Sequence, residues 1–290
     1  MTPHRSHTTG YRPSVDALPA QPLPPSLPPR TGWRRLARLL AHLTWWDMVS
    51  LYFGSWAGLL WNFALPAVVI LAYLAVFELT PGFRFGGGRH EVGGFGLNLV
   101  AGLLPWLLFQ ESVARAASSF VDNRHMLSQI PLPASLFPLA NVGSALARHV
   151  AGWGLFAAIL LGSGLMPSKL WLLLPVLLVP LLLLAGGGAV VAACCTVLWR
   201  DVAPTIQVAM LPLFFATPVI YPAYAVPDKL RFVMDLNPLS GVVVAYRDVL
   251  VTGRMPQLEP LLYALCVGAV LVALAAVLVR RIGPELAERL

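Results

Sequence analysis

The chain consists of long apolar segments separated by short polar ones. Six strongly apolar segments of 16 or more residues contain no charged side chain. A helix needs about 20 apolar residues to cross the hydrocarbon core of a bilayer, and a soluble domain would carry polar residues along most of its helices. We therefore expect an all-α integral membrane protein with six transmembrane helices. Their predicted positions are residues 56–77, 92–110, 150–165, 170–199, 202–227 and 260–279.

The two ends of the chain differ from this pattern. Prolines recur from Pro13 to Pro29, which prevents a helix, and this segment offers too little apolar surface to fold alone. We expect residues 1–32 to form a disordered, proline-rich cytoplasmic tail and residues 283–290 to form a short cytoplasmic tail. The transmembrane domain then covers residues 56–282.

Residues 33–55 predict an amphipathic helix before the first span. Apolar side chains recur at helical spacing from Trp33 to Leu43, while arginines of the same segment occupy the other faces. A basic amphipathic helix lies in the headgroup layer with its apolar face down, so we expect an interfacial helix here. The alternative is a soluble helix that packs on a partner protein.

Charge gives the orientation of the spans. Of the 20 Lys and Arg residues, 13 fall in cytoplasmic segments if the N-terminus is inside, which favours both termini in the cytoplasm. Anionic headgroups attract such arginines, so the net charge of +7 requires no nucleic acid partner. The cysteines Cys194, Cys195 and Cys266 show no metal-ligand spacing, and we expect them to be packing residues without a metal site.

A polar segment between the second and third spans predicts a cytoplasmic helix over residues 118–129, ended by Pro131 and Pro133. Such a helix is suited to act as a rigid lever that docks into another protein, and an ordinary connecting loop is the alternative. Six residues are expected at this contact, and two of them, Arg200 and Asp201, lie between the fourth and fifth spans. The six residues are Asp122, Asn123, Arg124, His125, Arg200 and Asp201.

Residues 236–246 are apolar but too short to cross a bilayer, and charged residues flank them. This pattern is typical of a re-entrant segment that reaches into the membrane from the outer side, before the last span. Asn237 is expected to cap a helix that begins at Pro238. Arg247 and Asp248 are expected to hold its far end at the headgroups, so that the segment gates a pathway. A surface flap without function is the alternative.

Three segments resemble a known family when they are taken together and in order. They read SSFVDNRHMLSQIPLPASLFPL at 118–139, LWRDVAPTIQVAMLPLFFATPVIYP at 198–222 and LNPLSGVVVAYRDVLVTG at 236–253. They are similar to the permease subunits of type 2 ABC exporters, in the branch that exports O-antigen, capsule, teichoic acid and related polyol phosphates. The resemblance covers nearly the whole chain from about Trp33.

The resemblance implies a homodimer in the inner (plasma) membrane, bound on its cytoplasmic side by two copies of a separate ATPase. The sequence contains no G-x-x-x-x-G-K-S/T loop for ATP phosphates. We therefore expect a permease that is not itself an enzyme and binds no cofactor, while ATP and Mg belong to the partner subunit. The expected substrate is a lipid-linked glycan. Membrane lipid is a further expected partner of the chain.

This function suggests further candidate residues. Sugar rings slide over aromatic surfaces, so we expect Phe214, Phe215, Tyr221 and Tyr246 to line the outer pathway, although Tyr221 also fits an interfacial aromatic belt. Arg148 falls close to an apolar segment, where a charge is costly. It is a candidate to bind a phosphate or pyrophosphate of the substrate lipid, and snorkelling to the headgroups is the alternative.

Two other functions compete with polysaccharide export. One is a type 2 ABC exporter of drugs or other small amphiphiles. The other is a membrane-bound transferase, which needs a catalytic acid or base or a metal cluster near the interface. The carboxylates Asp228, Asp235 and Asp248 are scattered on the outer side with no His nearby, which argues against a transferase.

Overall fold

The computed structural model describes residues 32–50, 94–129, 132–162, 166–221 and 226–282, with Gly164 and six residues between Ala64 and Ala75. Across these ranges the chain is helical and contains no strand. The expected tails, and all but six residues of the expected first span, lie outside the described residues.

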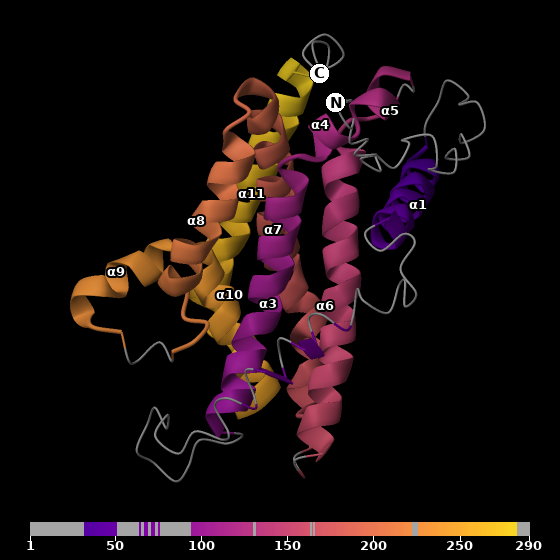
Figure 1. Ribbon diagram of the computed structural model, residues 1–290. Helices are drawn as coiled ribbons and strands as arrows, with labels where there is room; N and C mark the ends of the chain where they lie inside the picture. Colours follow the sequence, from indigo (N-terminus) through magenta and orange to yellow (C-terminus); the bar gives the residue numbers. More distant parts are fainter. Residues whose placement is uncertain are drawn as a thin grey trace, which may run out of the picture.

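Four long helices run alongside one another and form the body of the bundle (Figure 1). They are α3 (Gly94–Ala116), α6 (Leu136–Gly162), α7 (Leu174–Leu198) and α11 (Leu258–Ile282). Each is long and apolar enough to cross a membrane, α7 together with the short 3-10 helix η3 (Lys169–Leu173) before it. Helices α3, α7 and α11 lie where the second, fourth and sixth spans were predicted, with α3 ending six residues later than expected.

The third span begins earlier than the sequence predicts. The charge-free segment starts at Val150, whereas α6 starts at Leu136 and carries Arg148 and His149 near its middle. The prediction was wrong at this boundary because it took the nearest charge as the helix end. A charge is tolerated inside a span where it faces the bundle and has a partner, and Arg148 pairs with Glu111 of α3.

The fifth predicted span is not one long helix. Helix α8 (Val202–Ala216) has 15 residues, which is about 22 Å and shorter than a hydrocarbon core of about 30 Å. Thr217 has an extended backbone, as the residue before Pro218 prefers. The chain then forms α9 (Asp228–Leu236), α10 (Pro238–Arg247) and the π-helix η5 (Asp248–Thr252) before α11 begins.

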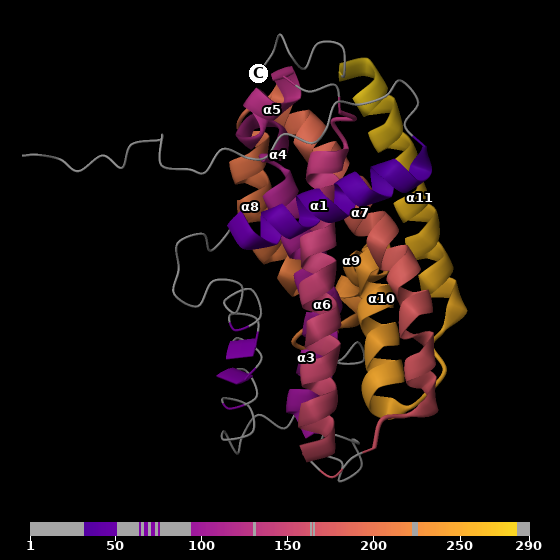
Figure 2. The ribbon, with the colours of Figure 1, turned by 90° about the vertical axis from the view of Figure 1, so that its right-hand side faces the viewer.

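Helix α1 (Trp33–Ser50) crosses the long helices instead of running along them (Figure 2). A Cβ at Gly143 of α6 would meet Thr44, so glycine permits this close crossing. The Ser144 hydroxyl donates to the Thr44 carbonyl over 3.3 Å, and Arg115 of α3 pairs with Asp47 at 2.8 Å. This crossing direction is the one that a helix in the headgroup layer takes.

Helices α7 and α11 share the most extensive helix–helix contact in the described part of the chain. A Cβ at Gly187 would lie 2.8 Å from the backbone nitrogen of Val272, and one at Gly268 would lie 2.7 Å from the Leu183 Cβ. Small residues at these two positions let the backbones approach closely, which is how helices gain packing energy in lipid. Both helices also contact α10, which precedes α11 in the chain.

Candidate functional site

The first candidate surface lies where α6 begins and α7 and α11 end. Here α4 (Ser119–Asp122) and α5 (Arg124–Gln129) follow α3. The predicted single helix over 118–129 is therefore two short helices. The break falls at Asn123, whose backbone leaves the helical region while its side-chain amide donates to the Ser119 carbonyl over 2.8 Å.

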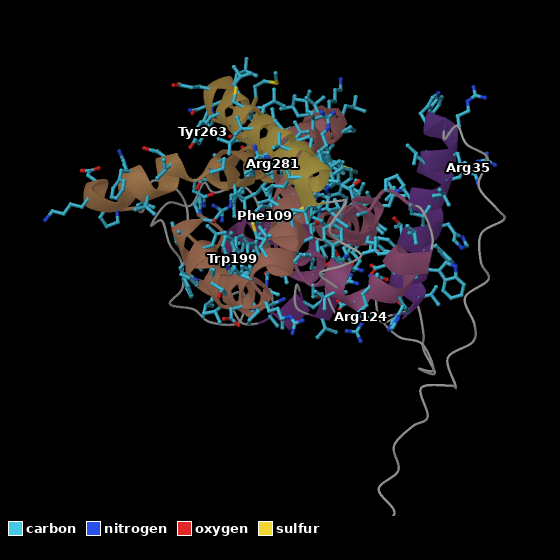
Figure 3. All side chains as sticks on the ribbon, turned by 90° about the horizontal axis from the view of Figure 1, so that it is seen from above. Arg35, Phe109, Arg124, Trp199, Tyr263 and Arg281 are labelled. Carbon is cyan, nitrogen blue, oxygen red and sulfur yellow. The ribbon has the colours of Figure 1, made fainter. Side chains whose placement is uncertain are left out.

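The turn between α7 and α8 lies at the same end of the bundle. Figure 3 looks onto this end and shows Arg124, Trp199 and Arg281 on it. Arg200 and Asp201 are exposed in the turn beside Trp199. We call the part of this end formed by α4, α5 and the turn the α4 surface. Five of the six expected contact residues are exposed on this surface: Asp122, Arg124, His125, Arg200 and Asp201. The sixth, Asn123, is half-buried.

The second candidate region is the re-entrant unit, which we define as α9, α10 and η5. Helix α9 extends away from the long helices (Figure 1). The expected cap of α10 is present, because the Asn237 side-chain oxygen accepts from the Leu239 amide at 3.0 Å and Pro238 occupies the first turn. The Asn237 amide group also donates to the Thr217 hydroxyl over 2.8 Å, which ties α10 to the end of α8.

Arg247 is enclosed by the bundle and contacts protein carbonyls, which the sequence analysis did not anticipate. It is 8% exposed, and its guanidinium donates to three carbonyls: Asn98 at 2.9 Å, Tyr221 at 3.0 Å and Val219 at 2.5 Å. Because α8 has ended at Ala216, the carbonyls of Val219 and Tyr221 have no place in a helix ladder. Arginine offers five N–H donors in a fixed fork and satisfies all three groups together.

Tyr246 also differs from its expected position. Its side chain is fully buried between helices, whereas a pathway-lining residue would face a hollow surface. The His149 Nδ1 lies 3.0 Å from the Leu104 carbonyl, and its Nε2 lies 3.0 Å from the Tyr246 hydroxyl. A carbonyl only accepts, so Nδ1 carries the proton and Nε2 accepts from Tyr246. In this structure Tyr246 links the re-entrant unit to α6.

Arg148 forms an ion pair with Glu111 at 2.6 Å, with 8% and 27% of the two side chains exposed. Neither expected role describes this geometry, because the guanidinium lies within the bundle and contacts a carboxylate of α3. Substrate phosphate would have to compete with Glu111 for it.

The remaining aromatic candidates lie near the end of α8. The Phe214 ring packs on Trp106 of α3 with 5.2 Å between ring centroids, while Phe215 is 57% exposed. The Tyr221 hydroxyl donates to the Phe215 carbonyl over 2.6 Å. Of the four expected lining residues, Phe215 is the one that presents most of its side chain on the surface of the described chain.

Several residues of these networks escaped the sequence analysis. Glu111, His149 and Asp47 each bind a partner on another helix, at separations of 37 to 97 positions along the chain. The available signal was that each is an ionisable residue beside an apolar segment. Such a residue in a membrane helix needs a partner, although its sequence position does not say which one.

The described residues therefore define a polytopic membrane protein in which several shorter helices stand where one continuous fifth span was expected, with polar and ionic links buried between helices. The chain belongs to the ABC-2 type transporter family, whose family model matches residues 38–251.

Three curated relatives support this assignment. The chain is 28% identical over 252 residues to a protein of Myxococcus xanthus named O-antigen export system permease protein RfbA, which covers 86% of this chain and 94% of that protein. Two Klebsiella pneumoniae proteins of the same name are 24% and 23% identical. The two alignments cover 74% and 75% of this chain, and 81% and 82% of the respective Klebsiella proteins.

Proposed function

We propose that this chain is the permease subunit of an ATP-driven exporter that moves a lipid-linked cell-surface polysaccharide outward across the inner membrane. The observation that carries the proposal is the similarity over 94% of the length of a protein named as an O-antigen export permease. The non-helical backbone from Thr217 to Tyr221, between α8 and the re-entrant unit, supports it, because such backbone at membrane depth is tolerated where it borders protein or a water-filled route.

In the proposed assembly, two copies of the chain bind two copies of a separate ATPase, and both chain termini lie in the cytoplasm. The α4 surface faces the ATPase, which binds ATP and Mg. Exposed Asp122, Arg124 and His125 supply polar contacts there, and the rigid link from α4 to α3 and α7 transmits the movement. Helix α9 leaves the bundle and exposes the apolar side chains of Phe232 and Leu236. These side chains favour a contact between α9 and the second copy of the chain.

The polymer route passes the exposed Phe215 and the neighbouring Phe214 and Tyr221, whose flat rings suit sugar faces. The link from Asn237 to Thr217 holds the re-entrant unit against α8 in the resting state. Arg148 lies near the middle of α6, and a substrate phosphate reaches it by displacing Glu111. Interfacial α1 lies beside this part of α6.

The test is a deletion of the chain in its native cell, followed by return of the wild-type gene. We expect the deletion to leave full-length lipid-linked polymer on the inner side and to remove it from the surface. The restored gene returns it to the surface only when the ATPase partner can hydrolyse ATP. Normal surface polymer in the deletion strain, with no second exporter present, contradicts the proposal.

A further inference from the structure

A pocket of about 550 Å³ lies between the end of α9, one side of α10 and the start of α11. Its volume is within the range of sites that bind small molecules, about 300 to 1,000 Å³. Tyr263 closes one side, because its hydroxyl donates to the Leu236 carbonyl at 2.9 Å, and Figure 3 shows Tyr263 beside α9. The pocket lies part of the way along the bundle, away from the end that carries the α4 surface (Figure 1).

The polar lining of this pocket consists mainly of hydrogen-bond acceptors. Asp235, Asp248 and Glu259 line it with Gln257, and no Lys, Arg or His is among the described residues around it. Arg254 and Arg247 act electrostatically on Asp248, while Asp235 and Glu259 are exposed. In the described part of the chain no three His, Cys, Asp or Glu groups are placed to hold a metal ion, so these carboxylates act as separate acceptors.

Ser240 gives an independent indication of a ligand. It is 5% exposed, it lines the same pocket, and its hydroxyl has no hydrogen-bond partner among the described residues. A buried polar group without a partner costs free energy, so such groups in folded proteins are usually satisfied by water or a ligand. Val244 and Pro260 supply apolar contact area beside it.

We propose that this pocket binds a neutral sugar unit of the exported polymer on the outer side, which rests on the proposed function above. A sugar ring carries hydroxyl donors around its edge and an apolar face, and the pocket offers carboxylate acceptors next to apolar side chains. Phosphate and carboxylate groups are repelled by Asp235 and Glu259. The pocket therefore takes the neutral repeating part of the polymer and rejects its phosphate-bearing end.

The test places the photo-crosslinking residue p-benzoyl-phenylalanine at Gln257 of the whole exporter, in cells that make the polymer. The matched control position is Met255, which is 70% exposed and lies outside the pocket. We expect irradiation to attach polymer to the permease at position 257 and not at position 255. Equal attachment at both positions, or attachment of phospholipid alone at position 257, overturns the proposal.

A second variant tests the carboxylates directly. Asp235→Asn with Glu259→Gln removes two charged acceptors at nearly constant volume, and should reduce polymer attachment at position 257 by about tenfold. Asp228→Asn changes another carboxylate of α9 that does not line the pocket, and should leave the yield unchanged. An unchanged yield in the double variant overturns the proposal.

Surface polymer measured in the same strains separates the two proposals. If export depends on the chain and a crosslinker at Phe215 captures polymer while Gln257 does not, the pocket proposal fails and the proposed function stands. If surface polymer does not depend on the chain, the proposed function itself fails.

Discussion

Arg148 of α6 and Glu111 of α3 form an ion pair of 2.6 Å between two membrane-spanning helices. Arg148 is almost fully buried, while Glu111 keeps 27% of its side chain exposed. The carboxylate therefore makes the arginine tolerable inside the bundle, and the two helices are joined by charge as well as by packing.

Removing one member of this pair should cost more than removing both. Glu111→Gln leaves a buried positive charge, and we expect it to lower the free energy of unfolding by about 3 kcal/mol. Glu111→Gln with Arg148→Gln should recover most of that loss. Thermal unfolding of the purified permease measures both. Asp228→Asn, which breaks the exposed 3.5 Å pair with Arg231, is the control and should cost less than about 1 kcal/mol. Additive losses in the double variant would show that the pair is not coupled.

The α4 surface should transmit ATP hydrolysis to the permease. Asn123→Ala with Arg124→Ala removes the amide that closes the α4–α5 break and an exposed charge. We expect normal amounts of permease in the membrane, with ATP hydrolysis that no longer drives export. Arg281→Ala removes an exposed charge at the same end of the bundle but away from α4 (Figure 3), and should export normally. Full export by the double variant would remove this role.

The Asn237 side chain should keep the resting permease closed. Asn237→Ala removes both the helix cap, which contributes about 1 kcal/mol, and the link to Thr217. We expect proteoliposomes that contain this variant to release a trapped dye in the absence of ATP. Thr217→Val removes the link and keeps the cap, so it shows which bond closes the route. Vesicles that stay tight with both variants would end the gate hypothesis.

Adjacent glycines of α7 should respond very differently to alanine. A Cβ at Gly187 would lie 2.7 Å from the Leu271 Cβ, and we expect Gly187→Ala to separate α7 from α11 and cost about 1–3 kcal/mol. Gly186→Ala is the matched control, because its new methyl group would lie 3.8 Å from Leu139. The melting temperature of the purified permease measures both changes. Equal melting temperatures would contradict the close packing.

Phe215 and Tyr246 should differ in their access to water. After Cys194, Cys195 and Cys266 are replaced by Ser, a cysteine at position 215 should react with a water-soluble maleimide if Phe215 lines the route. A cysteine at position 246 should stay unreactive in the resting state, because Tyr246 is fully buried. Protection of position 215 in every state of the transport cycle is the outcome that contradicts a lining role.

The sequence predicted the features that depend on neighbouring residues. Charge-free segments located α3, α7 and α11, and the Asn237-Pro238 pair predicted the start of α10 correctly. These predictions work because bilayer thickness and helix capping act over a single helix or a single turn.

The sequence could not predict the features that depend on distant partners. Arg148 looked like the boundary of a span because its partner Glu111 lies 37 residues away on α3. Arg247 looked like a headgroup anchor because the carbonyls it satisfies come from Asn98 and from the end of α8. The early end of α8 carried a local signal in Pro218, which the count of charge-free residues does not register.

The contact between Arg247 and the Asn98 carbonyl has a consequence for biosynthesis, since 149 positions separate the two residues. The ribosome makes α3 and α8 well before it makes Arg247. Until the arginine arrives, the carbonyls of Val219 and Tyr221, which follow the end of α8, need donors from water or from the insertion machinery. The newly made chain therefore stays incompletely closed on this side until the segment directly before its last helix has been synthesised.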